Sequence, residues 1–208
     1  MAVEVKKVME MAAAVVFHIQ ALNAVALAYL LGSIPFSLLI GKLWKKDPAR
    51  LGSGNIGAVN TFRHISPLAG LLSFFCDAGK GYLAVLLAAH AAQGWLAPLL
   101  AACAVVAGHN WMLFLKFRGG KGLAASFGAM LAFSPGGVLV ILVVMILLAL
   151  MLRDTNTAAA FGMVALPLYL YFVFEGAAFW GGALWAMMVI AKFWPDILAY
   201  RRGRRRLI

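Results

Sequence analysis

Charge is the first thing that this chain has little of. Only 12% of its 208 residues are charged and just 7 are Asp or Glu, whereas soluble domains carry about 25% charged residues. Hydrophobic residues make up 64% of the chain. Since a span needs about 20 apolar residues, the length allows roughly six or seven spans. The composition therefore predicts an all-α polytopic membrane protein with no separate soluble domain.

Cysteine is scarce as well. Cys76 and Cys103 both fall within apolar runs, where a thiol usually packs as a small apolar side chain. His18, His64 and His90 are scattered along the chain without the spacing of metal ligands. The sequence predicts neither a disulfide nor a metal site.

Apolar runs and the breakers between them predict the positions of the spans. Seven candidates lie at 20–43, 67–91, 95–115, 122–133, 137–152, 157–174 and 178–194. The fourth and fifth are short and are divided at Ser134-Pro135-Gly136-Gly137, so one re-entrant pair is the alternative. Residues 1–19 are predicted to form an interfacial lead-in, residues 20–194 the membrane domain, and residues 195–208 a basic cytoplasmic tail.

Basic residues are distributed unequally between the connections. The segments 42–66, 116–121, 153–156 and 192–208 hold 15 of the 18 Lys and Arg, and the connections on the other side hold none. Basic segments stay in the cytoplasm, which predicts an outside N-terminus, a cytoplasmic C-terminus and an odd number of spans, seven or five. The net charge of +11 fits this topology and contact with anionic headgroups, so nucleic acid is excluded as a partner.

One glycine-rich segment carries two cations beside the membrane. Phe117-Arg118-Gly119-Gly120-Lys121-Gly122 follows the apolar run that ends at Leu115. Glycine lets backbone N–H groups approach a ligand, and such groups beside Lys or Arg suit phosphate oxygens. A P-loop is excluded, because glycine follows Lys121 where that motif needs Ser or Thr, and because no strand is expected. The pattern predicts a phosphate-binding loop at a membrane edge.

A second glycine-rich cluster runs from Gly52 to Arg63 in the first cytoplasmic connection. It holds three glycines, one Ser, two Asn and an Arg, although Ser53 lies in no nucleophile elbow because position 51 is Leu. A flexible linker with an asparagine helix cap is the structural alternative. Arg63, close to the membrane surface, favours anion binding.

Two further polar groups lie within predicted spans. Asp77 and Lys80 have the i, i+3 spacing of a structural ion pair, and the alternative is that Lys80 faces the same cavity as the glycine loops. His109 precedes the cationic loop closely. It is either a hydrogen-bonded packing residue or a proton shuttle and phosphate donor at the cytoplasmic mouth.

Taken together, these clusters resemble a known family. The matching tracts are Ala28-Tyr29-Leu30-Leu31-Gly32-Ser33-Ile34-Pro35-Phe36, Gly52 to Arg63, Asp77-Ala78-Gly79-Lys80-Gly81, Gly108-His109, and Phe117 to Gly122. Their order, spacing and sidedness over roughly residues 25–194 are similar to those of the bacterial acyl-phosphate:glycerol-3-phosphate acyltransferases, the PlsY family.

The resemblance implies an activity. A member of this family is a seven-helix enzyme of the bacterial inner membrane whose site opens to the cytoplasm. It moves a fatty acyl group from acyl phosphate to the sn-1 hydroxyl of glycerol 3-phosphate, giving lysophosphatidic acid and phosphate. The resemblance implies membrane lipids as partners, a monomer, and no metal or organic cofactor.

The resemblance also implies site residues. Ser53, Arg63 and His109 are expected to be catalytic. The residues expected to bind substrate are Asn55, Gly57, Asn60, Lys80, Arg118, Gly119, Gly120, Lys121, Gly122 and Asn156.

This chain departs from the family pattern at several positions. Val59 and Ala125 stand where the family has threonine, Met112 where it has proline, and Asn156 where it has serine. In the C-terminal motif, Phe193 replaces a histidine and Asp196 replaces an asparagine.

An added carboxylate near a phosphate site is unfavourable unless a cation pairs with it, and the basic tail could supply that cation. Two alternatives therefore stay open: a relative with another acceptor or weak activity, and a non-catalytic transporter or scaffold.

Overall fold

The computed structural model describes residues 1–174 and 176–203, and in these residues every regular element is helical. The elements are α1 (Ala2–Gly32), α2 (Phe36–Leu43), η1 (Pro48–Arg50), α3 (Ala58–His64), α4 (Pro67–Ala91), α5 (Leu96–Asn110), η2 (Leu113–Leu115), α6 (Leu123–Phe133), α7 (Pro135–Leu152), α8 (Thr155–Gly162), α9 (Ala165–Phe174) and α10 (Ala178–Arg201). The predicted all-α fold is confirmed. The end of the predicted basic tail, residues 204–208, lies outside the described residues.

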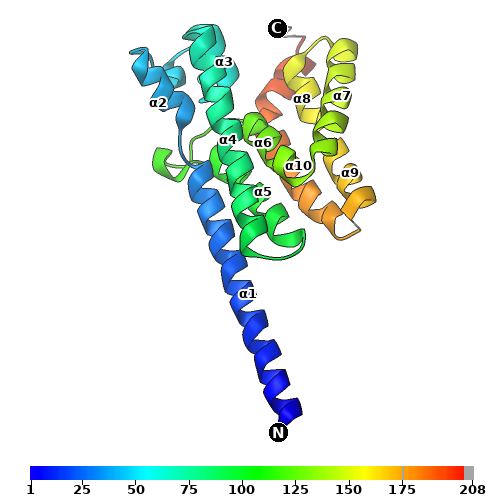
Figure 1. Ribbon diagram of the computed structural model, residues 1–208. Coiled ribbons are helices and arrows are strands. Elements are labelled where there is room, and N and C mark those ends of the chain that lie inside the picture. Colours follow the sequence, from blue (N-terminus) through cyan, green and yellow to red (C-terminus); the bar gives the residue numbers. More distant parts are fainter. Residues whose placement is uncertain (175, 204–208) are drawn as a thin grey trace.

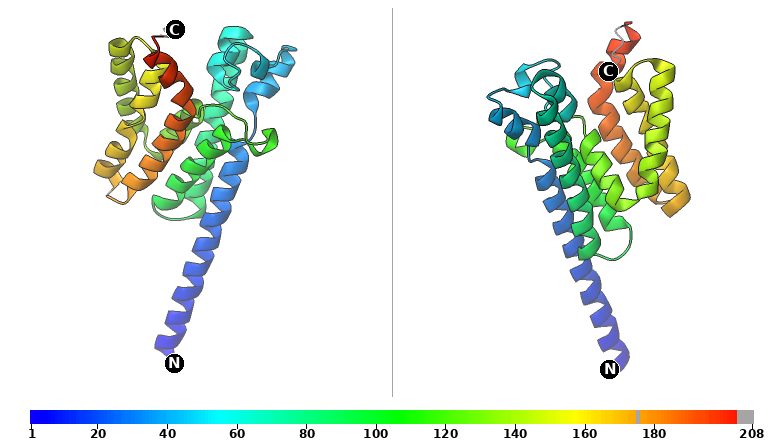
Figure 2. Two further views of the ribbon diagram at one scale, coloured as in Figure 1. Left: turned by 180° about the vertical axis from the view of Figure 1, so that it is seen from behind. Right: turned by 45° about the horizontal axis from the view of Figure 1, so that its top comes forward.

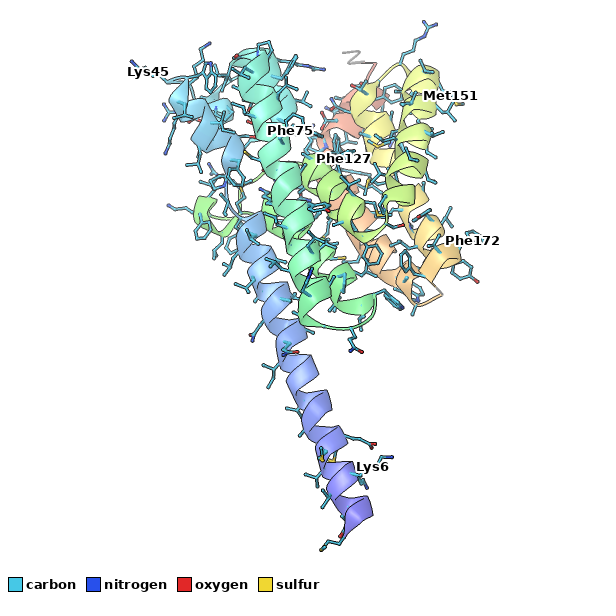
Figure 3. All side chains as sticks on the ribbon, viewed as in Figure 1. Lys6, Lys45, Phe75, Phe127, Met151 and Phe172 are labelled. Carbon is cyan, nitrogen blue, oxygen red and sulfur yellow. The ribbon has the colours of Figure 1, made fainter. Side chains whose placement is uncertain are left out.

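Within the described part of the chain, six helical segments are long and apolar enough to cross a membrane. They are Ile19–Leu43, Pro67–Ala91, Leu96–Leu115, Pro135–Leu152, Thr155–Phe174 and Ala178–Arg201. The fourth predicted span is the 11-residue α6, about 16 Å long at 1.5 Å per residue, against an apolar core of about 30 Å. Large side chains on the outer faces are apolar, including Phe75, Met151 and Phe172 (Figure 3), as expected for contact with lipid.

Two predicted spans are broken by proline. In 20–43, α1 ends at Gly32 and α2 begins at Phe36, because Pro35 lacks an N–H and keeps the residue before it out of the helical region. In 157–174, α8 ends at Gly162 and α9 begins at Ala165, because the ring of Pro167, in the first turn of α9, would clash with the carbonyl of Met163 in a continuous helix. Residues 2–19, the predicted lead-in, are helical and continuous with the first span, and Figure 1 shows them extending away from the bundle.

Small residues set the closest helix contacts. A Cβ on Gly128 of α6 would collide with the carbonyl of Ala78 in α4, and one on Gly81 of α4 would collide with that of Ala125 in α6. Close backbone approach through small residues is typical of membrane helices. The α4–α6 pair therefore forms one side of the molecule's interior.

The helices form two neighbouring groups. One contains α1, α4, α5 and α6, the other contains α7, α8, α9 and α10, and α10 packs on α5 while α6 contacts α7. Figure 1 shows α2, α3, the α7–α8 connection and the last turns of α10 at one end and the N-terminus at the other, and Figure 2 gives the same arrangement from two more sides. The polar loops of the first group thus lie at the same end as the start of α8.

Candidate active site

A cavity of about 610 Å³ lies between the two helix groups. Its apolar part is lined by Phe74, Phe127, Met130, Val138, Ile141, Leu142, Met145, Met163, Leu166 and Trp185. Its polar part is lined by Ser53, Asn55, Gly57, Asn60, Arg63, His64, Asp77, His109, Lys121, Gly122 and Asn156. Nine of the residues predicted from the sequence to act in the site are therefore brought to one cavity: Ser53, Asn55, Gly57, Asn60, Arg63, His109, Lys121, Gly122 and Asn156.

Asn60 organises the loop on the polar side. Its buried side-chain amide donates to the carbonyls of Pro48, Leu51 and Asn55 at 2.9, 3.0 and 3.0 Å. Its Oδ1 accepts from Ser53 N at 3.2 Å and from Ser53 Oγ at 3.3 Å. One amide thus holds the ends and the middle of the loop, and it fixes Ser53 in the cavity wall.

Glycine is required in this loop for two reasons. Gly52 and Gly54 have φ of +55° and +70°, which side chains disfavour. A Cβ on Gly52 would also collide with the ring of His64. The linker interpretation of this segment does not account for such tight packing.

Arg63 stands in the last turn of α3, exposed and in the cavity wall. Among the described residues it takes part in none of the ion pairs found, which join other groups. Its guanidinium can therefore offer several N–H donors to an anion in the cavity.

The second glycine loop packs against the end of α5. Gly120 N donates to the carbonyl of His109 at 3.0 Å, and a Cβ on Gly119 would collide with that same carbonyl. A Cβ on Gly120 would collide with the His109 ring. These two glycines, together with exposed Arg118, lie outside the cavity lining. Their packing brings Lys121 to the cavity wall.

Asp77, Lys80 and His109 form a buried polar group below the loops. Asp77 Oδ1 is 2.7 Å from Lys80 Nζ and 3.4 Å from His109 Nδ1. Lys80 Nζ also donates to the carbonyl of Ile34 at 2.9 Å, at the break between α1 and α2. Lys80 is thus an ion-pair partner behind the wall, while Asp77 lines the cavity. The i, i+3 spacing predicted Asp77 only as an ion-pair partner of Lys80, and its place in the cavity lining was not predicted.

Lys121 forms an ion pair across the site. Its Nζ lies 2.6 Å from Asp196 Oδ2, and it lies 4.5 Å from the centre of the Phe193 ring. Both residues belong to α10, so they join the loop to the second helix group. Lys121 is thus a cation beside Asp196, and the end of the basic tail, the other predicted source of one, lies outside the described residues.

The other unusual positions differ in where they lie. Val59 is 62% exposed and lines the cavity. Ala125 is fully buried against α4, where Gly81 approaches it. Asn156 lies in the first turn of α8. The N-cap of this helix is Asp154, whose side chain accepts a hydrogen bond from Thr157 N at 2.7 Å.

Comparisons with known proteins agree with this arrangement. The family model described as glycerol-3-phosphate acyltransferase matches residues 22–203. A glycerol-3-phosphate acyltransferase of Desulforamulus reducens is 40% identical over 154 residues, 74% of this chain and 77% of that protein. One from Neisseria meningitidis is 35% identical over 193 residues, 90% of this chain and 96% of that protein.

A solved structure has the same fold. The crystal structure of PlsY, an integral membrane glycerol 3-phosphate acyltransferase, in its glycerol 3-phosphate form, superposes with a TM-score of 0.82 at 31% identity, covering 90% of this chain and 95% of PlsY. Its lysophosphatidic acid form superposes with a TM-score of 0.79.

Fold, cavity and relatives define a class, the integral membrane acyltransferases of phospholipid synthesis. These enzymes transfer an acyl group to a phosphorylated acceptor. Within that class, the chain belongs to the glycerol-3-phosphate acyltransferase family.

Proposed function

We propose that this enzyme takes its acyl group from an acyl phosphate and transfers it to the sn-1 hydroxyl of glycerol 3-phosphate. The products are lysophosphatidic acid and inorganic phosphate. The observation that carries this proposal is a single cavity in which Arg63 and Lys121 line the polar part, while the remainder is apolar. Such a cavity suits two phosphates at one end and a fatty acyl chain at the other.

The two cations have separate roles in the proposal. Arg63 is free to bind the phosphate of the acyl donor, and Lys121 is assigned to the phosphate of glycerol 3-phosphate. Ser53, held by Asn60, orients the donor beside Arg63. The acyl chain extends between α6 and α7, past Met130 and Ile141.

The chemistry needs little beyond this orientation. The acceptor's hydroxyl oxygen attacks the carbonyl carbon, the carbon–oxygen bond to phosphate breaks, and phosphate leaves with the electron pair. The leaving phosphate accepts the hydroxyl proton, so atoms and charge balance without an enzyme base. His109 lies in the cavity wall beside Asp77 and donates a hydrogen bond to a phosphate oxygen. Positioning and charge stabilisation supply the catalysis.

We assign the enzyme to the bacterial inner membrane as a monomer, with the N-terminus outside and the C-terminus in the cytoplasm. Support comes from the unequal distribution of basic residues between the connections, and from the presence of α2, α3 and the last turns of α10 at one end of the molecule (Figure 1). An impermeant thiol reagent on intact cells should label Ala2→Cys and leave Gly203→Cys unlabelled until the cells are lysed. The reverse pattern would invert the assigned orientation.

A donor comparison tests the proposed reaction. Purified enzyme in detergent receives glycerol 3-phosphate with either palmitoyl phosphate or palmitoyl-CoA, and lysophosphatidic acid is quantified. We expect product from palmitoyl phosphate only, and product from the thioester alone would overturn the donor assignment. Ser53→Ala should remove activity and Arg63→Ala should lower it about 10- to 150-fold, whereas Cys76→Ala, with its side chain outside the cavity lining, should keep it.

A further inference from the structure

The ion pair between Lys121 and Asp196 has a consequence for acceptor binding. Lys121 is the loop cation that lines the cavity, and its side chain is 19% exposed while that of Asp196 is 10% exposed. At 2.6 Å, the carboxylate occupies one of the three donors of the ammonium and neutralises its charge. Because little water reaches either side chain, this neutralisation is only weakly screened.

Two contacts hold the Lys121 side chain against α10. Asp196 accepts its hydrogen bond, and the Phe193 ring, one turn earlier on the same helix, lies 4.5 Å from its ammonium. In the glycine loop, Gly122 has φ of +84° and Gly120 is bonded to α5. The lysine therefore has an anion beside it before any substrate enters.

The charges that line the cavity determine whether Asp196 strengthens or weakens phosphate binding. In the polar part of the cavity, Asp77 is already balanced by Lys80, so a bound phosphate meets mainly Arg63 and Lys121. With Asp196 against Lys121, one of these two positive charges is offset by a neighbouring carboxylate. A phosphate approaching Lys121 must displace the carboxylate or bind next to it, and either event weakens binding.

We propose that Asp196 is a specificity-determining residue that competes with the acceptor's phosphate for Lys121. In this enzyme it lowers the affinity for glycerol 3-phosphate and for inorganic phosphate, and it leaves the donor's phosphate at Arg63 unaffected. The inference rests on the proposed function for the assignment of Lys121 to the acceptor. Its physical core, competition between carboxylate and phosphate, can be measured without turnover.

The test compares Asp196→Asn, which keeps the size of the side chain, with the wild-type enzyme. Asp47→Asn is the matched control. It also removes one acidic charge from an ion pair, with Arg50 at 3.4 Å, but that pair lies outside the cavity lining and Asn still caps η1. Asp196→Ala is the second variant, because it removes the charge without offering an amide to the lysine.

Kinetics give the first readout. With palmitoyl phosphate saturating, Asp196→Asn should lower the KM for glycerol 3-phosphate by about three- to tenfold, the effect of one poorly screened charge. The KM for palmitoyl phosphate should change less than about twofold, as should both constants in Asp47→Asn. An unchanged or higher KM for glycerol 3-phosphate in both Asp196 variants would overturn the proposal, as would an effect on the donor KM alone.

Calorimetric binding of inorganic phosphate gives the second readout. Asp196→Asn should bind phosphate about three- to tenfold more tightly than the wild type and the control. Equal affinity in all four proteins would overturn the competition. Failure of the proposed function has a different signature: the wild type would make no lysophosphatidic acid, while the variants would still differ in their affinity for phosphate.

Discussion

The buried pair of Asp77 and Lys80 offers a quantitative prediction. Both side chains are 1% exposed, and they lie 2.7 Å apart. Lys80 also donates to the Ile34 carbonyl at 2.9 Å, and Asp77 lies 3.4 Å from His109 Nδ1. Asp77→Asn keeps the shape but leaves a buried ammonium without its counter-charge. Breaking a buried pair in this way costs about 3–5 kcal/mol of the free energy of unfolding. Lys80→Met should cost a similar amount, because it isolates the carboxylate.

The double variant separates pairing from other effects. In Asp77→Asn/Lys80→Met no buried charge remains, so its loss should be smaller than the sum of the single losses by about 2–3 kcal/mol. Unfolding by titration with SDS in mixed micelles, followed by far-UV circular dichroism, measures all four proteins. Strictly additive losses would refute the ion pair as the source of the instability.

Activity of the same variants tests the second contact of Asp77. Its Oδ1 is 3.4 Å from His109 Nδ1, and we expect it to orient that ring in the cavity. The double variant should therefore regain stability and still show a kcat about 10- to 100-fold below wild type, the effect of a misplaced catalytic group. Cys76→Ala is the neighbouring control on α4 and should match the wild type. Full kcat in the double variant would make Asp77 purely structural.

Three further predictions concern the cavity and its walls. Arg63→Ala should lower kcat/KM about 10- to 150-fold through lost charged hydrogen bonds, while Arg50→Ala, in a surface pair, stays within about threefold in the same steady-state assay. Gly128→Ala should lower the melting temperature because its Cβ meets a carbonyl of α4, whereas Gly79→Ala, which meets nothing within 4 Å, should raise stability by about 0.5–1 kcal/mol. Ile141→Trp narrows the apolar part of the cavity and should shift preference toward shorter acyl phosphates; an unchanged chain-length profile would place the acyl chain elsewhere.

Much of the fold could be predicted because membrane spans follow from composition. Apolar runs located the long helices to within a few residues in α4 and α7. The breaks at Pro35 and Pro167 were missed, although the chemistry of proline was visible in the sequence. A hydropathy pattern gives the length of an apolar run. It does not show whether the backbone hydrogen bonds of the helix continue along the whole run.

The site was harder to predict at the level of single residues. In a sequence, a glycine that makes room for a ligand cannot be distinguished from a glycine that makes room for a neighbouring helix, because a Cβ is excluded in both cases. Gly119 and Gly120 were predicted to bind substrate, and the structure gives them packing contacts with His109. Pairing of Lys121 with Asp196 joins residues 75 positions apart, so only the tertiary structure could identify it.

In the proposed reaction, the cavity transfers an acyl group from acyl phosphate to glycerol 3-phosphate. The decisive experiment follows lysophosphatidic acid and inorganic phosphate together, in one reaction of purified enzyme with palmitoyl phosphate and glycerol 3-phosphate. The proposed reaction predicts equal amounts of both products at every time point, with the formation of both slowed about 10- to 150-fold in Arg63→Ala. Phosphate released without lysophosphatidic acid would contradict it, because the cavity would then hydrolyse the donor or serve another acceptor.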